Sequence, residues 1–333
     1  MIIKRDVVFN SDIKIINNKT AVGNPASVII LDDQEDLKNT ELLQPIAIKE
    51  NQPISCFVKQ RFNNNEFDIR FFSPSGDEVN ICGHGSLIAG KILKEHFKIK
   101  EKEIILHLNK DICLGTMLES DDPIETIYVE EDGTISVKLF RIPFDKGILN
   151  KNELYVLHNV MKLLGLTEND IEAYIKSEEY HDLILILKDV NKLRNLNPNF
   201  EAITPYCKQI KDLRSVTFSA KSNLENFDYE TRVFAPHIDV NEDIVCVSIN
   251  SAISDYWSRK LNKKNLNVLY PYHWNKNTCG GIQYINVENK HIILYVKKLD
   301  SHIRGNDSSS QSIYCHSHEC GNPLYNHSNT KYE

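Results

Sequence analysis

The 333-residue sequence lacks any apolar run long enough to cross a membrane, and it has no block of basic residues. Its longest apolar stretches, 26–31 and 183–187, fall far short of the about 20 residues that a spanning helix needs. Lys and Arg total 39 against 46 Asp and Glu, so the net charge is −7. The first residues contain no apolar segment of a secretory leader. We therefore expect a cytoplasmic protein whose main partner is neither a membrane nor a nucleic acid.

Several common chemical signatures are also absent. No phosphate-binding loop, dinucleotide fingerprint or Ser-His-Asp pattern is visible. Eight cysteines in a long chain without a leader do not indicate a disulfide framework, so individual thiols become candidates for chemistry. Cys315, His316, His318 and Cys320 are zinc-type ligands, but their spacing matches no closed structural zinc site. We expect no metal and no cofactor.

What the sequence does contain is an alternation of strand and helix signals. A hydrophobic fraction of 41% is that of a globular protein, and the length suggests two domains. Helical spacing of apolar residues predicts helices over 87–96, 154–164 and 249–261, and over 41–49 if Pro45 is tolerated. Strands are predicted at 7–9, 26–31, 56–60, 67–72, 104–107, 127–129, 183–187, 227–234 and 292–296. The class is therefore α/β or α+β.

Two segments of the chain match each other, which indicates an internal duplication. Three residues recur at an offset of 162 and two more at 164: Arg70 with Arg232, Phe72 with Phe234, Pro74 with Pro236, Glu78 with Glu242, and Cys82 with Cys246. In both copies a strand, a turn, the pattern Glu-x-x-x-Cys and a helix follow in this order.

The repeated cysteines, Cys82 and Cys246, each precede a predicted helix. The free N–H groups and the dipole at a helix N-terminus bind carboxylates and lower the pKa of a thiol. Two facing domains would bring both thiols to one cleft. There, one thiolate removes a proton from the carbon next to a carboxylate, and the other thiol returns a proton to the opposite face. The alternative is that both cysteines are small buried residues of the core.

At these residues the sequence resembles the PhzF-like (phenazine biosynthesis) isomerase family of the diaminopimelate epimerase and proline racemase superfamily. Residues 23–28, Gly-Asn-Pro-Ala-Ser-Val, resemble the N-terminal signature GNPA-x-V. The segment from Phe72 to Gly85 resembles F-x-P…EV-x-x-CGHAT, and the segment from Phe234 to Ser248 resembles F-x-P…EDPVTGS. Order and spacing agree from about residue 5 to 299, nearly all of the chain except its end.

The resemblance implies an α+β, diaminopimelate epimerase-like fold. Such a fold has two similar domains, each a curled, mostly antiparallel sheet around a central helix, with the active site between them. We place the N-terminal domain at 5–125, completed by a late strand near 285–299, and the C-terminal domain at 126–284. Residues 300–333 are interpreted as an appended polar tail. Family members catalyse cofactor-independent proton shifts and are commonly homodimers, so we expect a homodimer with a small-molecule carboxylate substrate.

The candidate site follows from the motifs residue by residue. Cys82 and Cys246 are the expected acid/base pair. His84 matches the motif histidine that assists substrate binding and proton transfer, and Asp243 matches an active-site aspartate. Without the family match, His84 and Ser248 would be interpreted as helix caps. The remaining motif residues are expected to bind substrate: Asn24, Gly83, Gly85, Ser86, Val247 and Ser248.

Three of the positions that depart from the family pattern bear on the mechanism. Ile54 stands where the family has an acid/base glutamate in N-x-S-E-T-x-F, and Glu50, four positions earlier, is interpreted as a surface residue. Cys246 replaces a threonine, which makes the site resemble the two-thiol enzymes diaminopimelate epimerase and proline racemase. Val247 replaces a glycine and crowds the backbone nest that would receive a carboxylate.

Three functions therefore stay open. The first is a cofactor-independent racemase or epimerase of an amino acid or related metabolite, which uses Cys82 and Cys246. The second is a PhzF-type isomerase that shifts a double bond in a biosynthetic intermediate through His84 and Asp243. The third is a catalytically silent ligand-binding homologue, which is suggested by Ile54 and Val247.

Overall fold

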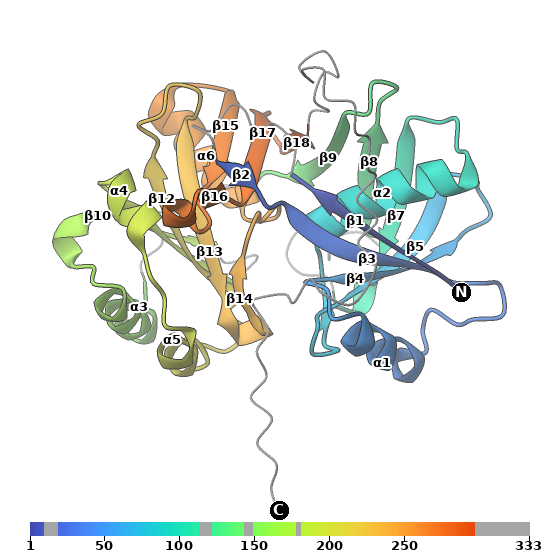
Figure 1. The fold of residues 1–333 in the computed structure, drawn as a ribbon, viewed down its shortest axis with the longest axis horizontal. Helices are drawn as coiled ribbons and strands as arrows, with labels where there is room; N and C mark the ends of the chain where they lie inside the picture. The colour runs from blue at the N-terminus through green and yellow to red at the C-terminus, as the bar shows by residue number, and fades with distance from the viewer. Residues whose placement is uncertain (10–18, 113–121, 143–148, 178–180, 297–333) are drawn as a thin grey trace, which may run out of the picture. The chain divides into compact units, whose positions relative to one another are not determined.

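Two series of strands follow the same path of neighbours, one in each half of the chain (Figure 1). In each series the successive pairings are antiparallel, parallel, antiparallel, parallel, antiparallel and antiparallel. The first series is β1 Ile2–Val8, β3 Asn24–Ile30, β4 Ser55–Gln60, β5 Glu66–Phe72, β7 Glu103–Leu108, β8 Ile124–Val129 and β9 Ile135–Phe140. The second is β10 Ile171–Ser177, β11 Asp182–Leu187, β12 Ser215–Lys221, β13 Tyr229–Ala235, β15 Asn265–Tyr270, β17 Gly281–Val287 and β18 His291–Val296. The internal duplication predicted from sequence is thus confirmed.

This computed structural model describes residues 1–9, 19–112, 122–142, 149–177 and 181–296. Met1–Lys298 form one compact unit. The predicted tail 300–333, with its Cys and His cluster, lies outside the described residues. The domain boundaries proposed at 125 and 284 stay predictions. The five cysteines among the described residues are free thiols, as expected.

The helices and short elements connect these strands. The helices are α1 Thr40–Glu50, α2 Gly83–Phe97, α3 Lys151–Leu163, α4 Val190–Asn195, α5 Phe200–Cys207 and α6 Asn250–Leu261. The short strands are β2 Thr20–Ala21, β6 Glu78–Val79, β14 Val240–Asp243 and β16 Thr278–Cys279. Four 3₁₀ turns occur among the described residues: η2 Lys110–Ile112, η4 Glu168–Asp170, η5 Pro236–Ile238 and η6 Trp274–Lys276. None of the described helices is both long and apolar enough to cross a membrane.

Helix α2 is the central element of the first series and packs against β1, β3, β8 and β9. It has almost no polar face, because residues 83–90 are all buried. Gly90 allows the closest approach to the sheet: a Cβ there would lie 2.8 Å from the Cβ of Ile127 in β8. The corresponding helix α6 packs against β15 and β17, with Trp257 fully buried and stacked on Tyr229. The predicted α+β class with a central helix in each half is confirmed.

Helix α1 covers the opposite face of the first sheet, where Leu43 and Ala47 pack onto Ile29, Phe57 and Phe72. The helix runs through Pro45, whose side chain is exposed. The buried face and the Asn39 cap hold this helix together although proline removes one internal hydrogen bond. Because successive side chains of a strand point to opposite faces, the first sheet is covered on both sides, by α2 on one face and by α1 on the other.

The two series are joined by the antiparallel pairing of β9 with β18, the last described strand. A strand is thus present within the range 285–299 where a late strand was predicted, and its completion of the N-terminal domain stays a prediction. An ion pair supports the junction, since Arg141 at the end of β9 contacts the buried carboxylate of Asp255 in α6. A second link is the parallel pairing of β2 with β16.

The repeated arginine and glutamate form the same ion pair in both halves, half-buried in the first and buried in the second. Arg70 in β5 donates Nε to Glu78 at 2.7 Å, and Arg232 in β13 donates Nε to Glu242 at 2.7 Å. Each guanidinium also donates to a backbone carbonyl: Arg70 to Leu37, Arg232 to Leu196. The pairs brace the loops that carry Cys82 and Cys246.

We expect the second pair to be costly to break, because its side chains are only 5% and 7% exposed. Arg232→Met leaves Glu242 charged without its partner and should lower the free energy of unfolding by about 3–5 kcal/mol. Urea unfolding measures this loss. The double variant Arg232→Met/Glu242→Leu should regain most of it; equal losses in both variants would contradict a role for the unpaired charge.

Candidate active site

The starts of the two central helices touch each other. A Cβ added to Gly83, the first residue of α2, would lie 2.7 Å from the Cβ of Val247 and would overlap its side chain. Val247 belongs to the turn before α6 and is itself 1% exposed. The β-branched side chain that replaces the family glycine is therefore accommodated by a glycine on the facing helix. The contact brings the Cys82 and Cys246 loops together.

Cys82 is the N-cap residue of α2 and lies beside His84, with Sγ 3.3 Å from Nδ1. The N–H of Gly85, three residues along, favours the thiolate. On its other side His84 faces the carbonyl of Pro25 in β3. Cys82 therefore has an imidazole as its nearest titratable neighbour, and the signature segment 23–28 helps to position that imidazole.

Cys246 lies in the equivalent place in the second half. The N–H of Ile249, again three residues along, favours its thiolate, and its Sγ is 3.7 Å from Ser248 Oγ. The nearest acid is Asp243, whose carboxylate favours the protonated thiol. Asn24 fixes Asp243 from the first half, with Nδ2 2.8 Å from Oδ1 of the aspartate and 3.2 Å from the carbonyl of Val245.

The two cysteines are not equivalent in one respect. Cys82 caps α2 directly, whereas Cys246 lies three residues before Ile249, the N-cap of α6. Each cysteine precedes its helix as expected, and α6 begins within one residue of the predicted helix 249–261. The cause of the difference is local: the Asn250 side chain donates to the carbonyl of Cys246, which Tyr270 and Gln283 also bind. Since that carbonyl is occupied, regular helix begins later.

The sequence also predicts that helix N-termini lower the thiol pKa, and here the structure reverses the sign. Burial raises the pKa of Cys82 well above its usual value, with Cys56 adding to the effect. Burial likewise raises the pKa of Cys246, and Asp243 adds to it. The N–H groups that favour each thiolate are outweighed, because desolvation penalises a buried charge more strongly. Both thiols are therefore protonated in this state.

The imidazole of His84 is the group that can accept a proton from Cys82. Burial lowers its pKa, although Asp243 and the Pro25 carbonyl act in the opposite direction. A neutral imidazole accepts a proton, so His84 can take the proton of Cys82. Asp243 can do the same for Cys246. Each thiol thus has its own proton acceptor. Its deprotonation to a thiolate base therefore does not require bulk water.

Three further residues of the predicted substrate-binding set are engaged within the protein. The N–H of Ser86 donates to the carbonyl of Cys82, and the Ser86 hydroxyl donates to Glu125. Ser248 accepts a hydrogen bond from Arg214 at 2.7 Å. Asn24 holds Asp243, as described above. Substrate contacts by Ser86, Ser248 and Asn24, and by the backbone of Gly83, Gly85 and Val247, stay predictions.

Sequence reasoning missed Glu125, a buried carboxyl in β8 that is 2% exposed. Its Oε2 accepts from Ser86, and its Oε1 has no hydrogen-bond partner among the described residues. Burial raises its pKa to about 7. The signal was present in the sequence: in β8, Glu125 shares the period-2 face of Ile127 and Val129, which points at α2.

The position of Glu50 was predicted wrongly. The sequence suggested a surface residue, but its side chain is 6% exposed. Its carboxylate binds Arg5 at 2.8 Å and accepts from Ser27 at 2.7 Å. Ser27 pairs with Ser55, so these groups lie on the α1 face of the sheet and not on the α2 face. Glu50 therefore does not replace the glutamate that is missing at Ile54.

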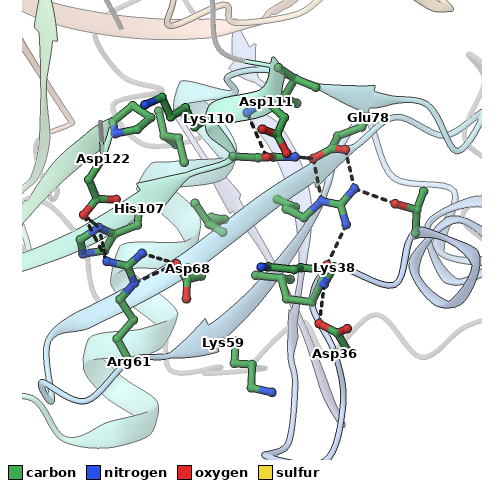
Figure 2. Close-up of a pocket in the computed structure, with 18 residues that line it drawn as sticks. Asp36, Lys38, Lys59, Arg61, Asp68, Glu78, His107, Lys110, Asp111 and Asp122 are labelled. Carbon is green, nitrogen blue, oxygen red and sulfur yellow. Dashed lines mark hydrogen bonds and ion pairs between the residues drawn. The ribbon is translucent and has the colours of Figure 1, made fainter. Parts of the chain in front are cut away.

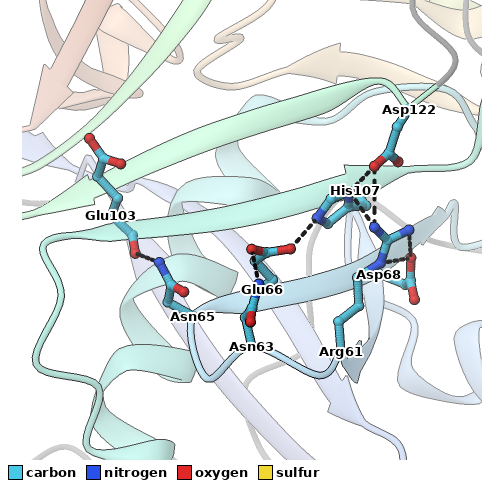
Figure 3. A network of polar contacts seen from close by, with 8 residues as sticks. All are labelled: Arg61, Asn63, Asn65, Glu66, Asp68, Glu103, His107 and Asp122. Atoms are coloured by element: carbon cyan, nitrogen blue, oxygen red, sulfur yellow. Dashed lines mark hydrogen bonds and ion pairs between the residues drawn. The ribbon is translucent and has the colours of Figure 1, made fainter.

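A large pocket of about 840 Å³ lies on that same outer face, among β4, β5, β7 and the loop before α1 (Figure 2). Its charges are largely paired. Arg70 binds Glu78, and Arg61 binds Asp68 and Asp122. His107 links Asp122 to Glu66 in the network of Figure 3. None of the candidate site residues lines this pocket, so we do not assign the chemistry to it.

Comparison with known proteins gives the same family that the motifs indicate. The family model described as phenazine biosynthesis-like protein matches residues 15–291. An uncharacterized isomerase of Halalkalibacterium halodurans is 26% identical over 282 residues, which cover 83% of this chain and 90% of the relative. A phenazine biosynthesis-like domain-containing protein of Homo sapiens is 23% identical over 264 residues, covering 75% and 83%.

Solved structures share the fold. The crystal structure of a PhzF family protein of Enterococcus faecalis superposes with a TM-score of 0.66 at 21% identity, covering 89% of this chain and 94% of the other. A predicted epimerase of Pseudomonas aeruginosa gives a TM-score of 0.62 at 15% identity, covering 89% and 95%. The diaminopimelate epimerase-like fold expected from the motifs is confirmed at this level.

The contact between the starts of the two helices can be tested by enlarging the side chain at Gly83 and shortening the one at Val247. Gly83→Ala should lower the free energy of unfolding by about 1–3 kcal/mol, because the new methyl group overlaps Val247. Alanine is otherwise favoured over glycine in a helix. Combining it with Val247→Gly should remove the clash, which a double-mutant cycle in urea measures as a favourable coupling. Additive losses would contradict the contact.

The buried acid Glu125 should make stability depend on pH. Its folded pKa of about 7 lies above the ordinary value of 4.5. Its contribution is therefore fully present below pH 4.5 and is lost as the pH rises through 7. Glu125→Gln should remove this loss, so that the variant gains about 3 kcal/mol relative to the wild type between about pH 4.5 and pH 8. Urea unfolding at about pH 4.5 and at about pH 8 measures the difference. An equal pH dependence of the wild type and the variant would mean that folding does not raise the pKa of Glu125.

Proposed function

Because the chain belongs to the phenazine biosynthesis-like protein family, we propose that it is a cofactor-independent isomerase with Cys82 and Cys246 as its acid/base pair. It moves a proton at the carbon next to the carboxylate of an amino acid or a related small metabolite. The cytoplasmic location and the homodimer stay predictions of the sequence.

One observation carries this proposal: each thiol is coupled to a proton acceptor on its own loop. His84 lies 3.3 Å from Cys82, and Asp243 acts on Cys246. Asn24 ties Asp243 to the strand that also positions His84. Two thiol and acceptor pairs that meet where two helices begin are suited to proton transfer on opposite faces of one carbon.

The reaction follows from these pairs. His84 takes the proton of Cys82, and the resulting thiolate removes the hydrogen from the substrate carbon. The electron pair left behind is delocalised into the carboxylate. The thiol of Cys246 gives its proton to the opposite face and becomes a thiolate. The proton that His84 took from Cys82 is released to solvent, and a solvent proton restores the Cys246 thiol. The protein supplies no net proton, and the substrate changes only its configuration.

A second candidate is the PhzF-type isomerase, which would use His84 and Asp243 directly. It is favoured by the raised pKa of both thiols, because protonated thiols are weak bases. In this mechanism His84 removes the proton, and Cys82 and Cys246 only shape the site. The two candidates differ in whether a thiol exchanges hydrogen with the substrate.

We expect deuterium from heavy water to appear at the carbon next to the carboxylate when the protein is incubated with a panel of amino acids and hydroxy acids. Cys82→Ala and Cys246→Ala should each abolish racemisation, because both faces of the carbon need a base. Mass spectrometry and chiral chromatography measure label and configuration. Cys207→Ala, at a buried cysteine in the separate core around α3 and α5, is the matched control.

The variants separate the candidates. Label that persists in both cysteine variants but disappears in His84→Gln would favour the PhzF-type reaction. Absence of label from the wild type, over amino acids, hydroxy acids and cyclic carboxylates, would favour the silent ligand-binding homologue that Ile54 suggested.

A further inference from the structure

The first half of the chain keeps a buried carboxyl on the face where the family glutamate is missing. Ile54 follows α1 and lies next to Gly85 of α2: a Cβ on Gly85 would be 3.2 Å from Ile54 Cγ2. The same point is 2.8 Å from Cys56 Sγ and 3.4 Å from Cys82 Sγ. The two sulfur atoms are therefore neighbours across Gly85, and the next helix residue, Ser86, donates to Glu125.

Glu125 acts on both thiols by its charge. Burial is the main cause of the raised pKa of Cys56, and the charge of Glu125 adds to it. Burial also dominates the raised pKa of Cys82, to which Cys56, Asp243 and then Glu125 add. Glu125 and Cys56 are buried and Cys82 is half-buried, so water screens the repulsion between their charges less than it does at the surface. A Glu125 carboxylate and a Cys82 thiolate therefore oppose each other.

Among the described residues, no basic side chain offsets this repulsion around Glu125. Its partner in β7 is Leu106, and the side chain of β9 that shares its face is Leu139. From β4 it meets the neutral thiol of Cys56, and from α2 the hydroxyl of Ser86. The pKa of Glu125 is set by burial, which raises it, and by Ser86, which lowers it. His84 and Asp243 act on the thiol side of the cluster and not on Glu125.

We propose that Glu125 is a positioning residue of the isomerase: its carboxyl must hold a proton when Cys82 becomes a thiolate, so that the cluster carries no more than one negative charge. Loss of that proton keeps Cys82 in its thiol form. Two interacting acids that share a buried site commonly titrate in this way, one after the other. The catalytic meaning of the inference rests on the proposed function, but the ionisation itself does not.

The test is the alkylation of Cys82 by iodoacetamide as a function of pH, because the thiolate is the reacting species. The full chain is labelled briefly, and mass spectrometry resolves each cysteine. Below about pH 6, where Glu125 is protonated, the wild type and Glu125→Gln should react at equal rates. At about pH 8 to 9 the variant should react about two- to threefold faster, because Glu125 is one of several groups that raise the pKa of Cys82.

Matched controls separate charge from structural damage. Glu50→Gln removes a buried carboxylate on the other face of the same sheet and should leave the Cys82 curve unchanged. Glu125→Asp keeps a titratable carboxyl and should stay near the wild type. Cys207 should stay unreactive in Glu125→Gln, since its labelling would report a loosened core.

The outcomes are decisive in both directions. A difference that opens only as the pH rises through about 7 supports the inference, even if no isomerase substrate is ever found. Coincident curves for the wild type and Glu125→Gln overturn it, even if the isomerase activity is confirmed. Equal acceleration at all pH values, or acceleration in Glu125→Asp as well, would point to altered access to Cys82 and would also overturn it. Where activity is measurable, Glu125→Gln should extend the alkaline limb of kcat and leave KM unchanged.

Discussion

Desolvation is the constraint on which the rest of this site depends. His84, Cys246 and Glu125 at this site are buried and Cys82 is half-buried. Among the described residues, no arginine or lysine acts on Cys82, His84 or Glu125. Each group must therefore be neutral or must share its charge with a neighbour. This requirement explains why thiol, imidazole and carboxyl occur as neighbouring pairs.

Elsewhere the same chain solves the problem of a buried carboxylate differently. Arg194 binds Glu230, whose carboxylate is fully buried. Arg214 binds the fully buried carboxylate of Asp182 and also reaches the site, where it donates to Ser248 and its charge favours the Cys246 thiolate. Those ion pairs fasten strands and loops. Among the described residues, Cys82, His84 and Glu125 have no such cationic partner, so burial raises the pKa of Cys82 and Glu125 and lowers the pKa of His84.

Much of this architecture follows from local patterns in the sequence. The repeated Arg, Phe, Pro, Glu and Cys spacing predicted the duplication, because the repeated residues do equivalent work in both halves. Arg70 and Arg232, for instance, clamp equivalent loops. The helix through Pro45 and the core position of Trp257 also follow from periodicity and burial. Such features depend on neighbours within a few residues.

The features that sequence reasoning could not supply depend on distant partners. The sign of the thiol pKa shifts reflects burial by the whole fold, which no motif encodes. The hydrogen bonds to the Cys246 carbonyl come from Tyr270 and Gln283, which lie on two other strands. Glu50 was misjudged because Arg5 and Ser27, far back in the chain, cover it.

The pairing of β9 with β18 has a consequence for how the chain is made. A ribosome delivers residues 135–140 long before residues 291–296, so β9 presents an uncovered edge while the whole second half is synthesised. Contacts between residues so far apart form slowly, because a long loop must close first. The first half thus waits for its last neighbour, and during that interval the nascent protein is open to pairing with the wrong strand.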